Sequence, residues 1–209
     1  MTLSPYPPKT VTMVATGPSL TLSDFLALPY IEDSPAWEYV NGTISQKPMP
    51  KTFHSRLQLK LASAIDLAGD TNQCALAFTE LRCTFPDRSI VPDIVVLAWD
   101  RLPVNAAGEP DNQAINFAPD WVIEILSPQQ NMTKVMKNIL YCLEQGSELG
   151  WLIDPEERSI LVFLPQQPPQ CYFANDPEEN NGQEVLPVLT GLPLSLTTEQ
   201  IFAWLKLAH

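Results

Sequence analysis

The feature that most constrains this chain is one acidic residue inside an otherwise apolar run. Residues 121–126 read Trp-Val-Ile-Glu-Ile-Leu, so Glu124 lies in the middle of a segment typical of a strand covered on both faces. Burying an unpaired charge costs on the order of several kcal/mol. Glu124 therefore requires a cation, a basic side chain or a proton, unless it belongs to a structural ion pair or faces water from an edge strand.

A second apolar strand brings in another acid. Asp93 follows Pro92 and opens the run Ile-Val-Val-Leu, and proline without its N–H fits the start of a strand or a bulge. A Pro-Asp pair alone is also common in turns. Two carboxylates carried by two apolar strands, however, form the hard-oxygen set that Mg²⁺ or Mn²⁺ prefers.

A helix expected over residues 131–145 adds basic side chains. Lys134, Lys137 and Tyr141 are spaced i, i+3 and i+7, so they share one helix face. If this helix packs beside the Glu124 strand, a lysine reaches the two acids. The alternative is a solvated row of lysines.

The order of the expected elements predicts an α/β fold with a mixed sheet. An Asn-Gly turn at 41–42 between two β-prone runs predicts a hairpin. We expect a leader over 1–19 and one domain over 20–209, with 165–209 as a C-terminal extension. Expected helices cover 20–29, 53–68 (ended by Gly69), 131–145 and 197–207, and expected strands cover 74–82, 90–98, 121–126, 149–153, 159–164, 171–174 and 184–189.

Composition excludes several classes of protein. The formal net charge of -12 argues against a broad basic face for nucleic acid, although a local metal site is compatible with it. No apolar run is long enough to span a membrane. Four cysteines without a CxxC pair predict buried thiols in a reducing cytoplasm, and two histidines exclude a His-rich metal site. Four basic residues, Lys47, Lys51, Arg56 and Lys60, form either a small basic rim or a solvated face.

The order and spacing of these short motifs resemble a known family. Pro92-Asp93, Ile123-Glu124-Ile125-Leu126, Lys137 with Tyr141, and Trp151–Pro155 look like the Uma-type endonucleases of the PD-(D/E)XK, restriction-endonuclease-like superfamily. The similarity also covers Trp37–Gly42 and His54, so it extends from about residue 20 to 164.

The resemblance implies a restriction-endonuclease-like core, with a central mixed β-sheet flanked by helices. It also implies that Asp93, Glu124 and the backbone carbonyl of Ile125 bind Mg²⁺ or Mn²⁺. The superfamily lysine normally stands two residues after the acid, where this chain has Leu126, and the family pattern moves it to Lys137. Auxiliary candidates are Glu38, His54 and Tyr141, with Glu80 weaker; each also has a plain structural explanation as a hairpin, helix-terminal, packed or strand residue.

We therefore expect a cytoplasmic, metal-dependent endonuclease that acts on DNA, as a homodimer by analogy with the family. The alternative is a non-catalytic nucleic-acid-binding or regulatory module that retains the fold. A glycosidase with Asp93 and Glu124 as its carboxylate pair is a third reading, but a lysine beside the pair and five tryptophans in the chain make sugar binding a poorer fit.

Overall fold

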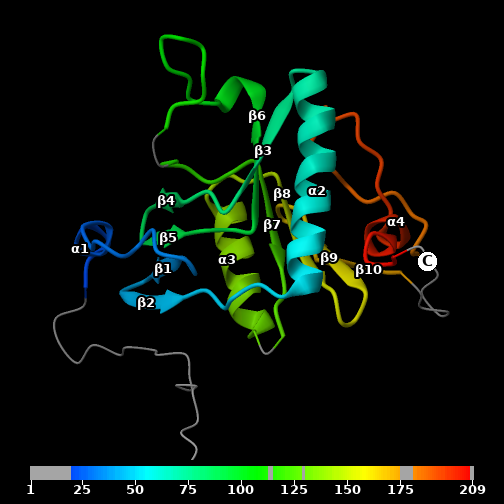
Figure 1. The fold of residues 1–209 in the computed structure, drawn as a ribbon, viewed down its shortest axis with the longest axis horizontal. Helices are drawn as coiled ribbons and strands as arrows, with labels where there is room; N and C mark the ends of the chain where they lie inside the picture. Colours follow the sequence, from blue (N-terminus) through cyan, green and yellow to red (C-terminus); the bar gives the residue numbers. More distant parts are fainter. Residues whose placement is uncertain (1–19, 113–114, 129, 175–180, 208–209) are drawn as a thin grey trace, which may run out of the picture.

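The chain forms two β-sheets, a large one and a small one, with helices packed against the large sheet (Figure 1). The computed structural model describes residues 20–112, 115–128, 130–174 and 181–207. The expected leader over 1–19 lies outside the described residues. A short helix, α1 (Leu22–Leu26), precedes the first strand, and Thr21 caps it.

The large sheet has six strands in the order β10-β9-β8-β7-β6-β3. Only β7 and β8 run parallel, and every other neighbouring pair is antiparallel. The predicted mixed sheet flanked by helices is therefore confirmed. The strands are β3 (Ala75–Thr79), β6 (Ile94–Ala98), β7 (Trp121–Ile125), β8 (Leu149–Asp154), β9 (Ser159–Phe163) and β10 (Gln170–Phe173).

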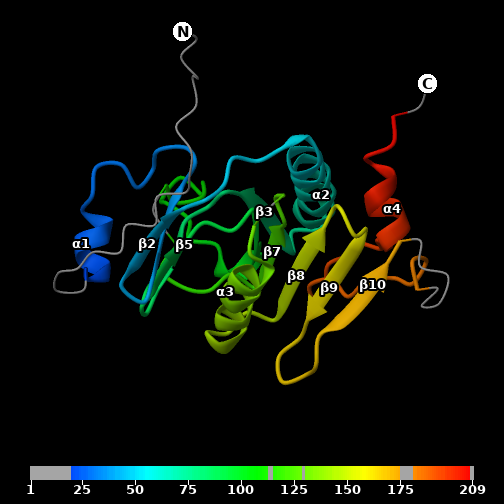
Figure 2. The same cartoon turned by 90° about the horizontal axis from the view of Figure 1, so that it is seen from below.

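Helices cover both faces of this sheet. Figure 2 shows α2 (Thr52–Thr71) and α3 (Met132–Glu144) on opposite sides of it. The odd-numbered residues of β7, from Trp121 to Ile125, belong to the core under α2, whereas Val122 and Leu126 belong to the core under α3. Side chains alternate between the two faces of a strand, so Glu124 lies on the α3 side.

The small sheet has four strands in the order β2-β1-β5-β4, and all pairs are antiparallel. The predicted hairpin is confirmed: β1 and β2 pair directly on either side of Asn41 and Gly42, which have φ angles of 48° and 82°. Such positive angles suit Asn-Gly in a two-residue turn. The strands are β1 (Trp37–Val40), β2 (Thr43–Gln46), β4 (Cys83–Phe85) and β5 (Arg88–Ile90).

The segment 90–98, predicted as one strand, instead joins the two sheets. β5 ends at Ile90 in the small sheet, and β6 begins at Ile94 in the large one. Pro92 has no N–H to give to a sheet ladder, so the chain leaves one sheet and enters the other at this point. Asp93 consequently lies at the junction, immediately before β6.

The first long helix extends past its predicted end. Gly69 lies inside α2, which continues to Thr71. A Cβ atom on Gly69 would lie 2.2 Å from the carbonyl oxygen of Ala75. This glycine is thus required by the close approach of α2 to β3 rather than by a helix end. Asn131 caps α3, and its side chain accepts a hydrogen bond from the N–H of Lys134.

The C-terminal segment packs on the α2 side of the large sheet. Helix α4 (Thr198–Ala203) is shorter than the predicted 197–207. The predicted strand over 184–189 is wrong, since the structure has only an isolated bridge between Val185 and Thr197 there. Leu186 and Leu189 are buried in the core on the α2 side of the sheet without forming a ladder, whereas Val185 is exposed.

Two further expectations concern the cysteine thiols and membrane-spanning helices. Cys83 and Cys142 are buried free thiols, as predicted, whereas Cys74 is a half-buried free thiol. In the described ranges, no helix combines the length and apolar character needed to cross a bilayer.

The contact between α3 and β8 generates a stability prediction. A Cβ atom on Gly150 would lie 2.3 Å from Cγ2 of Ile139, so Gly150→Ala should lower the free energy of unfolding by about 1–3 kcal/mol. Chemical denaturation should also show that Gly150→Ala with Ile139→Ala costs less than the sum of the two single changes. Strict additivity would contradict the close contact.

Candidate functional site

The two predicted acids lie next to each other at the junction of the two sheets. Asp93 precedes β6 and Glu124 lies in β7, where Ile94 pairs with Ile123. The exposed fractions of the two residues are only 2% and 3%. Such deep burial of two carboxylates requires compensating partners.

Lys47 is the main compensating partner. It follows β2, and its Nζ lies 2.7 Å from Oδ1 of Asp93 and 3.5 Å from Oε2 of Glu124. The amine also donates to the carbonyl of Val91 at 2.7 Å, and the side chain is 12% exposed. Neither open reading of Lys47, a basic rim or a solvated face, holds, because its amine points inward to the acids.

Asp93 is held by both of its oxygens. While Oδ1 accepts from Lys47, Oδ2 accepts from the backbone N–H of Ile125 at 2.7 Å and lies 3.0 Å from Nε2 of His54. The Ile125 contact uses the edge of β7 that β6 leaves unpaired beyond the Ile94–Ile123 pair. This network fixes the position of the Asp93 carboxylate relative to the Glu124 strand.

Two auxiliary candidates belong to the same group. His54 lies in the first turn of α2 and is 5% exposed, and its Nδ1 has no hydrogen-bond partner among the described residues. Glu38, from β1, is also buried, and its Oε1 accepts from the N–H of Val91 at 3.1 Å. His54 and Glu38 are therefore not simply solvent-exposed residues of a helix end and a hairpin.

The buried charges do not balance. Burial alone would lower the pKa of Lys47, but attraction by Asp93, Glu124 and Glu38 outweighs it and raises that pKa. Burial would raise the pKa of Asp93, but Lys47 and His54 hold it below its usual value. For Glu124, burial and the nearby Asp93 and Glu38 carboxylates raise the pKa despite Lys47. The site thus carries more negative than positive groups.

The structure does not bring Lys137 to the acids. Its side chain is exposed on α3, and within the described residues no ion pair joins it to Asp93 or Glu124. The amine of Lys134 is also exposed and donates to Oγ of Ser45 at 2.7 Å. Helix α3 turns its apolar face, not its lysines, toward the sheet.

The remaining candidates have structural contacts. Tyr141 stacks on Phe85, lies under the guanidinium of Arg88 at 3.8 Å, and donates to the carbonyl of Pro86. It therefore packs at the outer end of the small sheet. Glu80 is exposed, its N–H donates to the carbonyl of Asp93 at 3.3 Å, and it lines the same cavity as Asp93.

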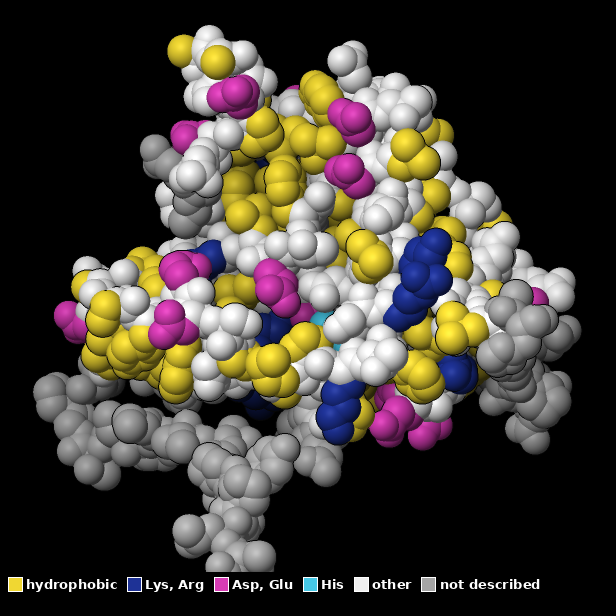
Figure 3. Space-filling model, in the orientation of Figure 1, with side chains coloured by type: hydrophobic (Ala, Val, Ile, Leu, Met, Phe, Trp, Pro, Cys, Tyr) yellow, Lys and Arg dark blue, Asp and Glu magenta, His cyan; other side chains and the backbone are white. Residues whose placement is uncertain are grey.

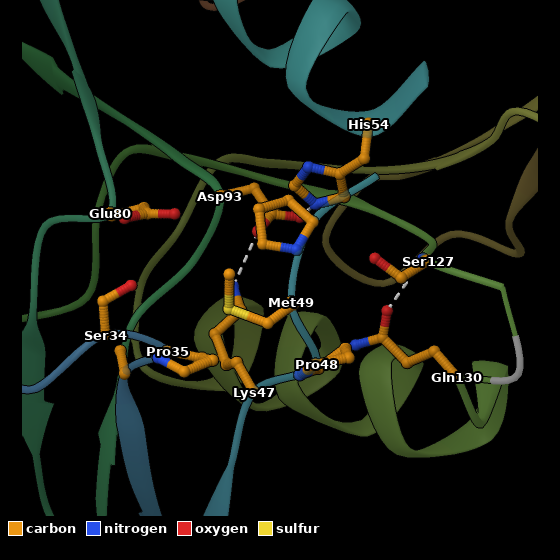
Figure 4. A pocket seen from close by; sticks show the side chains of 12 residues that line it. Ser34, Pro35, Lys47, Pro48, Met49, His54, Glu80, Asp93, Ser127 and Gln130 are labelled. Carbon is orange, nitrogen blue, oxygen red and sulfur yellow. Dashed lines mark hydrogen bonds and ion pairs between the residues drawn. The ribbon is translucent and has the colours of Figure 1, made fainter. Parts of the chain in front are cut away.

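A cavity of about 70 Å³ opens onto this group of residues. Figure 4 shows Asp93, Lys47 and His54 converging on it, with Met49 on one side and Ser127 and Gln130 on another. Gln130 accepts from the N–H of Ser127 at 3.0 Å, which fixes that rim. The cavity gives small polar groups access to Asp93.

The donor set fits a hard divalent cation. Asp93 and Glu124 supply carboxylate oxygens, and the carbonyl of Ile125 leaves the same strand edge as its N–H. In the residues with described positions, no three His, Cys, Asp or Glu side chains form a ready metal cluster. The amine of Lys47 contacts both carboxylates, so a cation that used both of them would have to displace it.

Comparisons with known proteins agree with this architecture. The Uma2 family model, described as "Putative restriction endonuclease", matches residues 22–199. A crystal structure of a "putative nuclease belonging to DUF820" from Anabaena variabilis ATCC 29413 is 45% identical, with a TM-score of 0.81. That match covers 89% of this chain and 99% of the other. The search of curated proteins gave no match.

The excess of buried acids predicts opposite effects of two substitutions on stability. Lys47→Met should lower the free energy of unfolding at pH 8 by about 3 kcal/mol or more, because it leaves buried carboxylates uncompensated. Glu124→Gln should be neutral or stabilising at pH 8. The exposed Lys137→Met is the matched control, expected to change little.

The pH dependence follows from the raised pKa of Glu124. The folded protein retains a proton that the unfolded chain releases near its ordinary value of 4.5, so this group costs stability as the pH rises above that value. The contribution of Lys47 to stability does not change with pH in this range, because its raised pKa affects stability only at far higher pH. Denaturation between pH 5 and 8 should show a smaller loss of stability in Glu124→Gln than in the wild type. An equal slope would contradict this.

Proposed function

This chain belongs to the Uma2 family, and from that premise we propose that it is a metal-dependent endonuclease that hydrolyses phosphodiester bonds in DNA. Family membership and the 45% identical nuclease neighbour support a nuclease as the general class. The resemblance found in the sequence is confirmed by the same matches. Metal dependence and DNA as the substrate are our further steps.

One observation carries the proposal: Asp93 and Glu124 both contact the amine of Lys47, and Asp93 and Lys47 line a small cavity. An acid pair with a lysine is the set of groups needed to bind a cation, hold a phosphate and orient a water. The three residues come from separate elements, so their convergence is a property of the fold rather than of one local motif.

In the proposed mechanism, Asp93, Glu124 and the carbonyl of Ile125 hold Mg²⁺ or Mn²⁺. When bound there, such an ion would supply Lewis-acid chemistry, that is, charge stabilisation at the scissile phosphate and a lowered pKa for a water. Lys47, once shifted from between the acids, donates to a phosphate oxygen and offsets its charge. His54 keeps Asp93 oriented through Nε2. In this proposal Lys47 takes the role that the family pattern assigns to Lys137.

The surface limits how DNA is bound. Figure 3 shows Lys and Arg side chains in separate patches on this face, between acidic and apolar ones, rather than in a continuous band. Phosphate contacts supply most non-specific affinity for DNA, so weak binding by the isolated chain is expected. We also propose a cytoplasmic homodimer, which would double the number of phosphate contacts.

A non-catalytic module remains the second candidate. The observation that favours it is the Lys47 amine itself, which already neutralises part of the acid pair at 2.7 and 3.5 Å. In that case the ion pair would serve stability alone, and the chain would bind nucleic acid or regulate another protein. The two candidates differ in whether divalent metal binds at the acids and whether cleavage follows.

Metal binding and cleavage should both depend on the acid pair. We expect Mn²⁺ to bind the wild type measurably in calorimetry, Asp93→Asn and Glu124→Gln to bind at least about tenfold more weakly, and both variants to lose DNA cleavage. Binding without cleavage would favour the non-catalytic module. Equal Mn²⁺ affinity in all three proteins would remove the proposed site.

The choice between the two lysines can be measured directly. Lys47→Met should reduce the cleavage rate by about a hundredfold or more, the typical effect of removing one group that stabilises developing charge. Lys137→Met should leave the rate nearly unchanged. Both variants are compared under conditions where denaturation shows that each is folded. The reverse pattern would assign the catalytic lysine to α3.

A further inference from the structure

A second pocket lies directly beside the proposed catalytic cavity. It has a volume of about 250 Å³ and is formed by the start of α2, the end of β7 and the turn after β8. His54 lines both cavities, so it forms part of the wall between them. Leu126, two residues beyond Glu124, also lines the second pocket. A substrate held in one cavity would therefore extend naturally into the other.

The walls of this pocket suit a flat, apolar ring. Phe53, Leu126 and Pro128 supply apolar surface, and Phe53 is 46% exposed although it is a large aromatic residue. Its ring also lies 5.3 Å from the guanidinium of Arg158. An accessible aromatic ring beside cationic groups is the arrangement on which single-stranded nucleic acids stack their bases.

Two charged residues at the pocket can bind the polar groups of a nucleotide, namely its phosphate and the amino group of its base. Lys51 precedes the first turn of α2, makes no capping hydrogen bond with its side chain, and can meet a backbone phosphate. Glu156 is exposed in the turn after β8, and its oxygens can only accept hydrogen bonds when ionised. An exocyclic amino group of a base is a suitable donor to it.

The small volume of the catalytic cavity disfavours a substrate whose bases stay stacked and paired beside it. Asp93 is 2% exposed and lines a cavity of only about 70 Å³. A base inside a duplex can leave its stack only at an unstacking cost. An unpaired nucleotide has no such cost. The absence of a continuous basic band on the face in Figure 3 also disfavours binding through duplex phosphates alone.

We propose that the second pocket binds the base of an unpaired nucleotide next to the scissile phosphate, so that the enzyme prefers single-stranded DNA, or single-stranded regions within a duplex. This inference rests on the proposed nuclease function for its catalytic part. The binding part stands on the pocket alone and can be measured without cleavage.

Binding is measured first, by fluorescence anisotropy with a labelled single-stranded oligonucleotide and with the same sequence as a duplex. The protein is the Asp93→Asn variant without divalent metal, so no cleavage interferes. We expect Phe53→Ala, added to this protein, to weaken single-strand binding about tenfold. Leu67→Ala is the matched control: it truncates another exposed apolar residue of α2 (71% exposed) that lines neither cavity.

A second measurement leaves the pocket residues unchanged. The wild type with Mn²⁺ is given single strands in which one nucleotide lacks its base, at successive positions. Cleavage next to the abasic nucleotide should fall about tenfold, while cleavage elsewhere in the strand continues. Glu156→Gln should alter which base is preferred at that position and leave the melting temperature unchanged.

The outcomes separate this inference from the proposed function. If duplex and single strand bind equally and Phe53→Ala behaves like Leu67→Ala, the base pocket is wrong even if metal-dependent cleavage is found. If no DNA is cut but Phe53→Ala still weakens single-strand binding, the pocket stands and the nuclease proposal fails. Uniform cleavage regardless of the abasic position would also overturn the inference.

Discussion

The structure depends on one buried ionic contact, that of the Lys47 amine with the carboxylates of Asp93 and Glu124. Its three members come from the end of the small sheet, the junction of the two sheets and the centre of the large sheet. The contact therefore ties the two sheets together at the cavity. A buried ion pair is costly compared with apolar packing, which makes chemistry a better reason for its presence than stability.

The large-scale fold could be predicted because hydrophobic period and turn chemistry act locally. The Asn41-Gly42 hairpin, both long helices and the apolar β7 strand followed from such patterns. The segment at 184–189 was misassigned because Leu186 and Leu189 are buried by packing into the core and not as members of a strand. The run 90–98 is not one strand, because its start pairs in the small sheet and its end pairs in the large sheet. A local sequence pattern does not show such a change of sheet.

The site could be predicted only in part, because sequence patterns are local and the site is formed by residues from separate elements. Asp93 and Glu124 were evident as charges that apolar strands must compensate. The role of Lys47 was missed because it was grouped with the basic residues that follow it in the sequence, and only the arrangement of the sheets directs it inward. Lys137 lies in the expected helix, but the apolar face of α3 packs on the sheet and leaves that lysine outside. The apolar side chains opposite the lysines, such as Val135 and Ile139, already indicated the inward face, and the assignment of Lys137 to the site came from the family pattern instead.

In this account the two cavities on either side of His54 bind different parts of the substrate. The buried charged groups bind the metal and the phosphate, and the apolar pocket binds a base. The most direct test of the central claim is anomalous diffraction from crystals grown with Mn²⁺. We expect one Mn²⁺ peak between the carboxylates of Asp93 and Glu124, with the Lys47 amine moved away from its contact with both. Strong Mn²⁺ peaks elsewhere, with the Lys47 contact unchanged, would contradict it.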